Sequence, residues 1–291
     1  MGSLYLVTGA AGHLGNTIVR ELADKGAPVR ALILPNEETD ALQSLPVAIY
    51  RGDVTVPDTL ASFFDVPDPD NTVVIHCAGI VSITSALNPV LYRVNVTGTK
   101  NVCDLCVAGG IGRLVYVSSV HAIPEAPHGQ TIIETAHMTQ MIADYMNNRL
   151  TAIVRGGYDF VDVRDVAAGI LSAAEHGQSG ESYILSNRYY EIHEIMDKLH
   201  EITGHRKIRT VMPLWFVRLT APLSEIYYKI RKKPPLYTSY SIYTLFSNSH
   251  FSHEKADREL FYRTRSLRET LSDTVRWMEE HNRISVPNGK Y

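Results

Sequence analysis

The sequence predicts an α/β fold in which a doubly wound parallel sheet is followed by a smaller C-terminal substrate-binding lobe. Five short apolar segments recur in the first 120 residues, and segments with helical spacing lie between them. Strands that are apolar throughout are typical of parallel sheets covered by helices on both faces. The chain has 291 residues, of which 45% are hydrophobic, so it can form one large domain with an added lobe. We expect the sheet domain to span residues 1–186 and the lobe to span mainly residues 187–291.

The first half of the chain provides the predicted sheet. Its strands are expected at residues 4–7, 29–34, 47–50, 73–76 and 114–117. A helix is expected over 16–25, where Ile18, Val19 and Leu22 share one face, and another over 95–108. Alternating strands and helices of this kind form parallel sheets.

The second half is expected to add further elements. Residues 182–186 predict a late strand, and residues 191–203 predict a helix that ends at Gly204. Asp165 is expected to cap the helix that follows it, because its carboxylate can accept free backbone N–H groups.

Composition excludes several classes of protein. The net charge of −3 and the pI of about 6.5 give no basic field for a nucleic-acid partner. Three cysteines do not make a disulfide framework and favour a reduced, cytoplasmic location. No signal peptide is recognised, and no apolar run is long enough for a spanning membrane segment.

The first predicted strand ends in a glycine-rich turn that opens the next helix. In this turn, Gly9 permits a tight bend, Gly12 lets the backbone approach a pyrophosphate, and Gly15 allows the helix to pack closely on the strand. The N-terminus of that helix favours a bound anion. The alternative is an ordinary strand–helix turn that contains glycine. The position of the turn favours a Rossmann-type dinucleotide site.

Four more segments carry a family resemblance. They are Gly52-Asp53-Val54, Cys77-Ala78-Gly79, residues 94–99 around Asn95, and Val117-Ser118-Ser119. With the glycine turn, they resemble the extended short-chain dehydrogenase/reductases, which form the NAD-dependent epimerase/dehydratase family. The segment 160–169 is especially similar to the dihydroflavonol-reductase and 3β-hydroxysteroid-dehydrogenase branch.

The resemblance implies a nicotinamide dinucleotide cofactor and a set of residues that hold it. Most of these residues lie at the carboxyl ends of the predicted strands, where ligands bind in open α/β folds. The implied cofactor-binding residues are Gly9, Gly12, His13, Leu14, Gly15, Asp53, Val54, Cys77, Ala78, Gly79, Asn95 and Val117.

The choice between NAD and NADP depends on the end of the second strand. A carboxylate there binds the ribose diol, whereas an arginine accepts the 2′-phosphate of NADP. Residues 33–35 are Ile-Leu-Pro and provide neither group. Glu37 and Glu38 follow in the loop, and Arg30 lies earlier on the strand. The absence of an arginine slightly favours NAD.

The resemblance implies Ser119 as the catalytic serine, but its usual partners are missing. In the family, a Tyr and a Lys at i and i+4 on the next helix transfer the proton and lower the pKa of the Tyr. Tyr228 and Lys232 have this spacing but lie too late in the chain, and Tyr145 with Arg149 lies in a helix of later family order. Neither pair is accepted as the relay.

The missing relay is best explained by a missing segment. Between Ser119 and residue 160 the chain is too short for the crossover helix and sixth parallel strand that the fold needs. We place the break at about residues 135–137, either as a true deletion or as a segment omitted from this numbering.

Other patterns are interpreted as structural. His193, His200 and His205 lack the spacing of a zinc site, so no metal is predicted. Cys103 and Cys106 are interpreted as packing residues. The apolar stripe over 215–230 is a core-facing helix, a substrate wall or a membrane-surface contact. Arg164 contacts a substrate or forms a surface ion pair.

These observations lead to three functional hypotheses. The first is an NAD(P)-dependent oxidoreductase that interconverts a secondary alcohol and a ketone on an apolar small molecule. The second is a nucleotide-sugar epimerase or dehydratase, and the third is a non-catalytic dinucleotide-binding protein. The resemblance also suggests a homodimer through the helix after Asn95.

Overall fold

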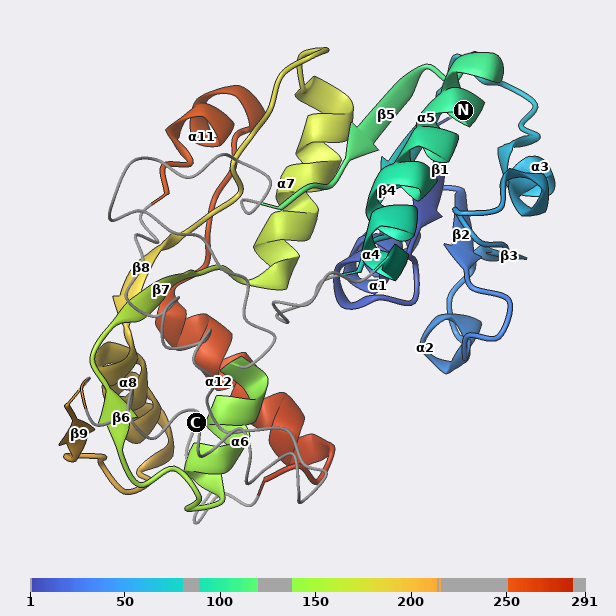
Figure 1. The fold of residues 1–291 in the computed structure, drawn as a ribbon. Coiled ribbons are helices and arrows are strands. Elements are labelled where there is room, and N and C mark those ends of the chain that lie inside the picture. The colour runs from blue at the N-terminus through green and yellow to red at the C-terminus, as the bar shows by residue number, and fades with distance from the viewer. Residues whose placement is uncertain (1, 81–88, 120–137, 214, 216–250, 285–291) are drawn as a thin grey trace. The chain divides into compact units, whose positions relative to one another are not determined.

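The computed structural model describes residues 2–80, 89–119, 138–213, 215 and 251–284 (Figure 1). The chain forms two compact units. Unit 1 comprises residues 1–119, 163–185 and 253–263, and unit 2 comprises residues 120–162, 186–252 and 264–291. The chain crosses between the units five times, and one crossing adjoins the boundary expected after residue 186.

The sheet of unit 1 is parallel and has five strands. They are β1 (Leu4–Thr8), β2 (Val29–Ile33), β3 (Ala48–Arg51), β4 (Thr72–His76) and β5 (Arg113–Tyr116). Their order is β3-β2-β1-β4-β5, and every neighbouring pair is parallel. The five predicted strands and the predicted fold class are therefore confirmed. The order reverses at β1, and ligands bind beyond the carboxyl ends of the strands at such a point.

Helices cover both faces of this sheet. The helices of unit 1 are α1 (His13–Asp24), α2 (Asp40–Gln43), η1 (Pro57–Leu60), α3 (Ala61–Phe64), α4 (Pro89–Tyr92), η2 (Arg93–Gly98), α5 (Thr99–Ala108), α7 (Val163–His176) and α11 (Glu254–Leu260). Neighbouring residues of β1 point to opposite faces, as expected for a strand. Val7 packs in the cluster under α1 and α7, whereas Leu6 packs with Phe63 and Val102 of α3 and α5. Two apolar layers thus sandwich the sheet.

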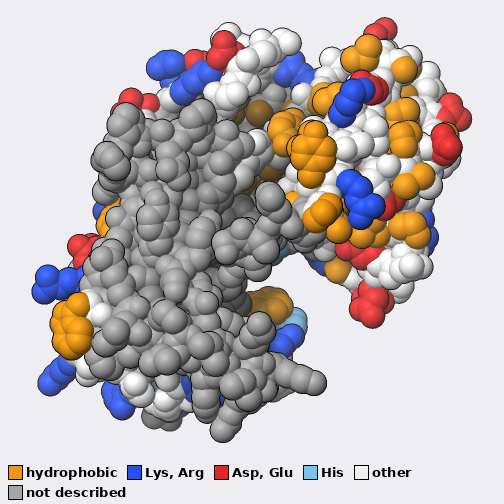
Figure 2. Space-filling view, in the orientation of Figure 1, with side chains coloured by type: hydrophobic (Ala, Val, Ile, Leu, Met, Phe, Trp, Pro, Cys, Tyr) orange, Lys and Arg blue, Asp and Glu red, His pale blue; other side chains and the backbone are white. Residues whose placement is uncertain are grey.

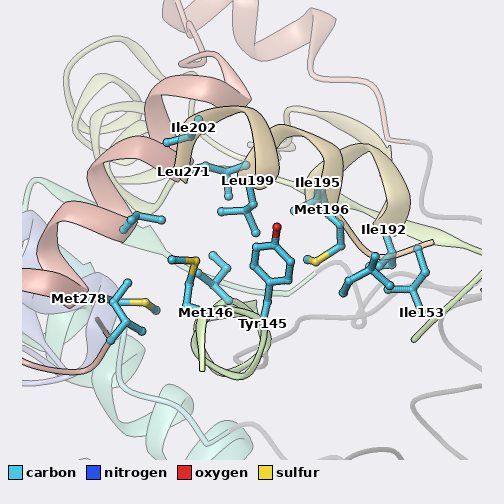
Figure 3. Close-up of a cluster of buried hydrophobic side chains, with 14 of the residues drawn as sticks. Tyr145, Met146, Ile153, Ile192, Ile195, Met196, Leu199, Ile202, Leu271 and Met278 are labelled. Atoms are coloured by element: carbon cyan, nitrogen blue, oxygen red, sulfur yellow. The ribbon is translucent and has the colours of Figure 1, made fainter. Parts of the chain in front are cut away.

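Unit 2 packs helices around a second core. Its elements are α6 (Met138–Met146), β6 (Ile153–Val154), β7 (Gly157–Phe160), β8 (Arg188–Glu191), α8 (Ile192–Thr203), β9 (Val211–Met212) and α12 (Leu267–Glu280). Side chains of α6, α8 and α12 meet in one buried cluster (Figure 3). The predicted helix over 191–203 is confirmed, with Glu191 as a capping-box residue and Gly204 in a left-handed C-cap.

Two predictions from the sequence are corrected. Residues 182–186 do not form a strand, because among the described residues the sheet ends at β5 and offers this segment no hydrogen-bonding neighbour. Asp165 does not cap its helix, because α7 already begins at Val163. Asp165 lies buried in the first turn, where a carboxylate still interacts favourably with the helix dipole.

Phe261 ends α11 in an unusual backbone conformation. Its φ of 54° lies in the left-handed region, and its side chain is 70% exposed. Glycine adopts this conformation without the steric cost of a Cβ.

We expect Phe261→Gly to raise the free energy of unfolding by about 1 kcal/mol, because it removes the left-handed strain from an exposed residue. Phe261→Ala removes the same ring but keeps a Cβ, so it should bring no such gain. Urea unfolding of the two variants provides the comparison. Equal stability of the glycine and alanine variants would show that backbone strain is not the relevant quantity.

Candidate functional site

The glycine turn between β1 and α1 is shaped by close backbone approaches. Gly9 has a φ of 67°, and a Cβ added there would lie 2.8 Å from Ala78 N. A Cβ on Gly15 would lie 2.2 Å from Gly9 O. Gly12 is exposed, and its N–H donates to Gly9 O at 3.0 Å. Gly9 and Gly15 are thus required for packing, while Gly12 presents bare backbone at the surface.

The N-terminus of α1 fits an anionic group. Gly12 is its N-cap, no side chain caps it, and its first turn contains no acidic residue. By contrast, side chains cap α8 and α12, through Glu191 and Ser266. The first N–H groups of a helix attract phosphate. The turn and the helix end therefore suit the pyrophosphate of a dinucleotide, with His13 and Leu14 in the first turn.

A buried histidine connects this turn to the end of β4. His76 is 1% exposed. Its Nδ1 lies 2.7 Å from Thr8 Oγ1, and its Nε2 lies 3.1 Å from Thr99 Oγ1. Ala78 N donates to Thr8 Oγ1 at 3.2 Å, and Thr99 Oγ1 donates to Asn95 O at 2.8 Å. One chain of hydrogen bonds therefore joins β1, the turn after β4 and the helix that begins with η2.

The partners of His76 determine its protonation. Because Thr99 donates its proton to a carbonyl, it accepts from His76 Nε2–H. His76 Nδ1 is then the acceptor for the Thr8 hydroxyl, which in turn accepts from Ala78 N–H. Burial lowers the pKa of His76 from 6.5 to about 4. The ring is therefore neutral at physiological pH.

The turn after β4 is held by Asn95. Its Oδ1 accepts from Ile80 N, and its Nδ2 donates to Ile80 O, both at 2.8 Å. The nearby Cys77 is half-buried, and burial raises its pKa to about 12. Cys77 is therefore a protonated thiol and no nucleophile. Asn95 binds the backbone of this turn and so positions Cys77, Ala78 and Gly79.

Asp53 follows β3 in a compact turn. Its Oδ1 accepts from both the N–H and the hydroxyl of Thr55 at 2.8 Å. Thr59 Oγ1 accepts from Asp53 N at 3.0 Å. Val54 lies against Gly98, where an added Cβ would meet Val54 Cγ2 at 2.7 Å. The carboxylate is thereby held in one orientation at the sheet edge.

Two charged side chains, Glu37 of the loop after β2 and Arg51 of β3, bind this loop, and sequence spacing did not reveal them as a pair. Glu37 Oε2 accepts from Leu34 N at 3.0 Å, so the carboxylate folds back to the carboxyl end of β2. Arg51, opposite Ile33 in the ladder, donates from Nη1 to the carbonyls of Leu34, Pro35 and Glu37 at 2.7–3.3 Å. The pairing of β2 with β3 in the sheet was the signal that pointed to Arg51.

Ser119 lies three residues beyond the end of β5 and is half-buried. The segments that begin with Gly9, Gly52, Cys77 and Val117 directly follow β1, β3, β4 and β5. Because these strands are parallel, their carboxyl ends lie along one edge of the sheet. The fold thus brings the predicted cofactor segments and Ser119 to a common edge.

The Tyr145 alternative is excluded by its position. Tyr145 is 2% exposed, its hydroxyl lies among the apolar side chains of unit 2, and burial raises its pKa to about 12 (Figure 3). Arg149 Nη1 lies 3.8 Å from Asp144 Oδ1. Tyr145 is therefore a core residue. Tyr228 and Lys232 lie outside the described residues, as do residues 135–137 and most of the 215–230 stripe.

The histidines and cysteines considered as metal ligands or redox groups make structural contacts. His193 Nδ1 lies 2.9 Å from Glu191 Oε2, and His200 Nδ1 lies 2.5 Å from His205 O. In the part of the chain that the structure describes, no group of three or more metal-ligating side chains occurs. Likewise, no described helix is long and apolar enough to cross a membrane. Cys106 is buried, as expected for a packing residue.

Comparison with known proteins decides the family. The profile of the 3-beta hydroxysteroid dehydrogenase/isomerase family matches residues 6–151, half of the chain. The chain belongs to this family. The match spans the glycine turn, the β4 network and Ser119, so the family resemblance inferred from the motifs is confirmed. Curated proteins similar to this chain are named as reductases and 3 beta-hydroxysteroid dehydrogenases.

Relatives match almost the whole chain. The sterol demethylase protein B of Methylococcus capsulatus is 28% identical over 331 positions, which cover 96% of this chain and 99% of that protein. A Synechocystis protein provisionally named dihydroflavonol 4-reductase is 26% identical over 339 positions, covering 98% and 97%. The UDP-glucose 4-epimerase structure of Thermotoga maritima has a TM-score of 0.73 at 18% identity, covering 96% of this chain and 99% of that chain. The last likeness shows the fold alone.

These alignments contain many positions at which the relative has a residue and this chain has none. Alignments of 331 and 339 positions exceed the 291 residues by 40 and 48, so at least that many positions of the two relatives face no residue here. A βαβ unit takes on the order of 30 residues or more. The relatives therefore have room for an element that this chain lacks.

Proposed function

We propose that this protein is an NAD-dependent oxidoreductase that interconverts a secondary alcohol and a ketone on an apolar small molecule. The observation that carries the proposal is the common edge of the sheet, along which the glycine turn, the His76 network and Ser119 follow parallel strands. The names of its relatives, a sterol-processing protein and a flavonoid reductase, support an apolar substrate. When bound, the nicotinamide ring supplies hydride exchange.

The chain's own residues have distinct roles in this proposal. The turn from Gly9 to Gly15 holds the pyrophosphate, and Asp53 faces the adenine. The turn from Cys77 to Gly79 follows the dinucleotide, and Asn95 fixes it through Ile80. The Ser119 hydroxyl orients the substrate oxygen by a hydrogen bond. Each role uses a backbone or side-chain group at the carboxyl edge of the sheet.

Between β5 and residue 160, this chain lacks the Tyr and Lys pair that transfers the proton in the resembled family. No Tyr and Lys at i and i+4 follow β5 before residue 160. A positioned acid or base contributes about 10²–10⁴-fold to the rate. Hydride transfer between the nicotinamide and the substrate carbon, which requires a proton to move to or from the substrate oxygen, should therefore be slow.

The test combines cofactor binding with a substrate panel. NAD and NADP are titrated by calorimetry, and the reduced nicotinamide is then followed with sterols, other apolar ketones and alcohols, and UDP-sugars. Slow turnover of an apolar ketone or alcohol, with Ser119→Ala lowering kcat and not the cofactor Kd, supports the proposal. Conversion of UDP-sugars favours an epimerase. Tight NAD binding without any turnover favours a dinucleotide sensor.

The preference for NAD follows from Glu37. Its carboxylate lies at the end of β2, where a carboxylate binds the ribose diol, although it comes from a later position in the chain. The Arg51 guanidinium is held by three loop carbonyls. A ribose diol suits this loop better than a 2′-phosphate, because the phosphate would lie against the Glu37 carboxylate.

We expect Glu37→Gln to weaken NAD binding by about tenfold, the effect of a lost charged hydrogen bond. Its affinity for NADP should rise at the same time. Glu38→Gln changes the exposed neighbour and should alter neither affinity. Calorimetric Kd values for both cofactors test this. Tighter binding of NADP than NAD by the unaltered protein would contradict the assignment.

A homodimer is proposed through one surface of unit 1. Tyr92, Val96 and Val107 are exposed on α4, η2 and α5, and Val107 is 83% exposed. Figure 2 shows apolar side chains gathered over this part of the molecule. Burial of such side chains is a usual basis for association.

We expect Val107→Asp to weaken the dimer by about tenfold or more, because it buries an unpaired charge at the interface. Val56→Asp makes the same change at an exposed valine near η1 and should leave the dimer intact. Sedimentation equilibrium measures the dissociation constants. A monomeric unaltered protein at high micromolar concentration would refute this interface.

A further inference from the structure

We propose that Arg51 is a positioning residue for the cofactor: it fixes the loop of residues 34–37 to the sheet and so holds Glu37 where its carboxylate meets the adenosine ribose of NAD. This inference rests on the proposed function, because it takes the ribose as the partner of Glu37. Arg51 acts through Glu37 and need not touch the dinucleotide. It thereby sets the preference for NAD over NADP.

The loop after β2 forms a turn of its own. Glu37 N donates to Leu34 O at 3.1 Å, and the Glu37 carboxylate accepts from Leu34 N at 3.0 Å. Pro35 lies at the second position of this turn, where its fixed φ is favoured. Ordering a residue costs about as much free energy as one hydrogen bond returns, so these internal contacts close the turn but hold it weakly.

Arg51 attaches this turn to the neighbouring strand. It is the last residue of β3, which lies beside β2 at the edge of the sheet (Figure 1). Its ladder partner is Ile33, the last residue of β2, and Gly52 N donates to Ile33 O at 3.0 Å. The backbone of Arg51 is therefore fixed where the loop begins. From there its Nη1 donates to three carbonyls of the loop at 2.7–3.3 Å, that of Glu37 among them.

The charge of Arg51 acts on these carbonyls and not on the Glu37 carboxylate. No ion pair occurs between these two described side chains: the carboxylate accepts from Leu34 N, and the guanidinium donates to the backbone oxygens. A charged donor makes stronger hydrogen bonds to carbonyls than a neutral one does. Glu37 therefore keeps its negative charge for the ribose hydroxyls, at a position that Arg51 fixes.

The three hydrogen bonds share one nitrogen, and this predicts what can replace Arg51. A lysine ammonium also offers three N–H donors on one nitrogen, whereas methionine has a long side chain without any donor. Direct binding of a 2′-phosphate would instead use the forked guanidinium, for which lysine is not equivalent. Arg51→Lys should therefore keep the loop in place, and Arg51→Met should release it.

Arg30 of β2 provides a matched control in the same sheet. Its Nη1 also donates to three backbone carbonyls, all within residues 62–65, at 2.8–3.1 Å. The guanidinium also lies over the ring of Tyr50, 5.1 Å from its centroid. Arg30→Met therefore removes at least as many contacts as Arg51→Met, but none of them is to the loop after β2.

The first measurement uses the full chain without cofactor, so its result does not depend on the proposed function. Amide hydrogen exchange is followed at Leu34 and Glu37, whose N–H groups are bonded within the turn. We expect Arg51→Met to speed exchange at both by about tenfold, and Arg51→Lys and Arg30→Met to change it by less than about twofold. Unchanged exchange in Arg51→Met would overturn the proposal whatever the cofactor does.

The second measurement is calorimetric titration of the same variants with NAD and NADP. We expect Arg51→Met to weaken NAD binding by about tenfold and NADP binding by less than about twofold, because the carboxylate that favours the diol is no longer held in place. Arg51→Lys and Arg30→Met should bind NAD as the unaltered protein does. In a Glu37→Gln background, Arg51→Met should weaken NAD binding by less than about twofold, because the carboxylate through which it acts is already absent.

Three results of the titrations would overturn the proposal. A larger loss for NADP than for NAD would make Arg51 a phosphate ligand. A full effect of Arg51→Met in the Glu37→Gln background would show that it does not act through Glu37. An equal loss in Arg30→Met would assign the effect to general destabilisation.

Failure of the proposed function has a different signature. If the unaltered protein bound neither cofactor, the proposed function and this role in recognition would fall together, while hydrogen exchange would still show whether Arg51 holds the loop. NAD binding without any turnover would count against the proposed reaction alone, and the Kd values would still decide the role of Arg51.

Discussion

Replacing Gly15 by alanine should weaken NAD binding by about 100-fold or more, which corresponds to about 2.7 kcal/mol. The added Cβ would lie 2.2 Å from Gly9 O and 3.2 Å from Ala10 Cα, so the turn and the first turn of α1 must move apart. A displacement of about 1 Å at a positioned site is enough for effects of this size. Calorimetric titration with NAD measures the loss.

The control for this variant is a glycine remote from the site. Gly110 ends the turn after α5 with a φ of +65°, and an added Cβ would meet nothing within 4 Å. Gly110→Ala should therefore lower stability by about 1 kcal/mol through backbone strain alone and leave NAD binding unchanged. If both variants lost affinity in proportion to their stability, the turn would have no special role in binding.

Much of unit 1 could be predicted because its signals are local. Each strand of the sheet is an apolar run, and three glycines at fixed spacing are enough to indicate a dinucleotide-binding turn. The edge on which Asp53, Cys77 and Ser119 lie follows from parallel strand order alone. Such features need no knowledge of distant contacts.

The features that could not be predicted from the sequence depend on tertiary contacts. Residues 182–186 have the composition of a strand, but a strand forms only with a neighbour, and pairing is not encoded in the segment itself. The sequence places Glu37 only in the loop after the second strand, whereas its hydrogen bond to Leu34 N and the approach of Arg51 come from the folded loop and from sheet pairing. The position of Tyr145 in the core of unit 2 also depends on residues far along the chain.

His76 should make the stability of the protein fall at mildly acidic pH. Its pKa is about 4 in the folded protein and about 6.5 when unfolded, so the folded state binds the proton only at a lower pH than the unfolded state does. The stability that this residue contributes is complete above pH 6.5 and is lost as the pH falls towards 4. The shift corresponds to roughly 3 kcal/mol, of which about 2 kcal/mol should be lost by pH 5.

The measurement compares urea unfolding of the unaltered protein and His76→Gln at pH 7.5 and pH 5. Other histidines titrate in both proteins, so the difference between the two pH dependences isolates His76. We expect the glutamine variant to be less stable at pH 7.5, because it cannot match both hydroxyl partners, and to lose about 2 kcal/mol less on acidification. Thr99→Val keeps the ring and removes its Nε2 acceptor, so it should destabilise the fold by about 1–3 kcal/mol while the pH dependence remains. Identical pH dependence in the unaltered and glutamine proteins would mean that the folded protein accommodates a charged imidazole between Thr8 and Thr99, and that the neutral network does not hold the cofactor turn.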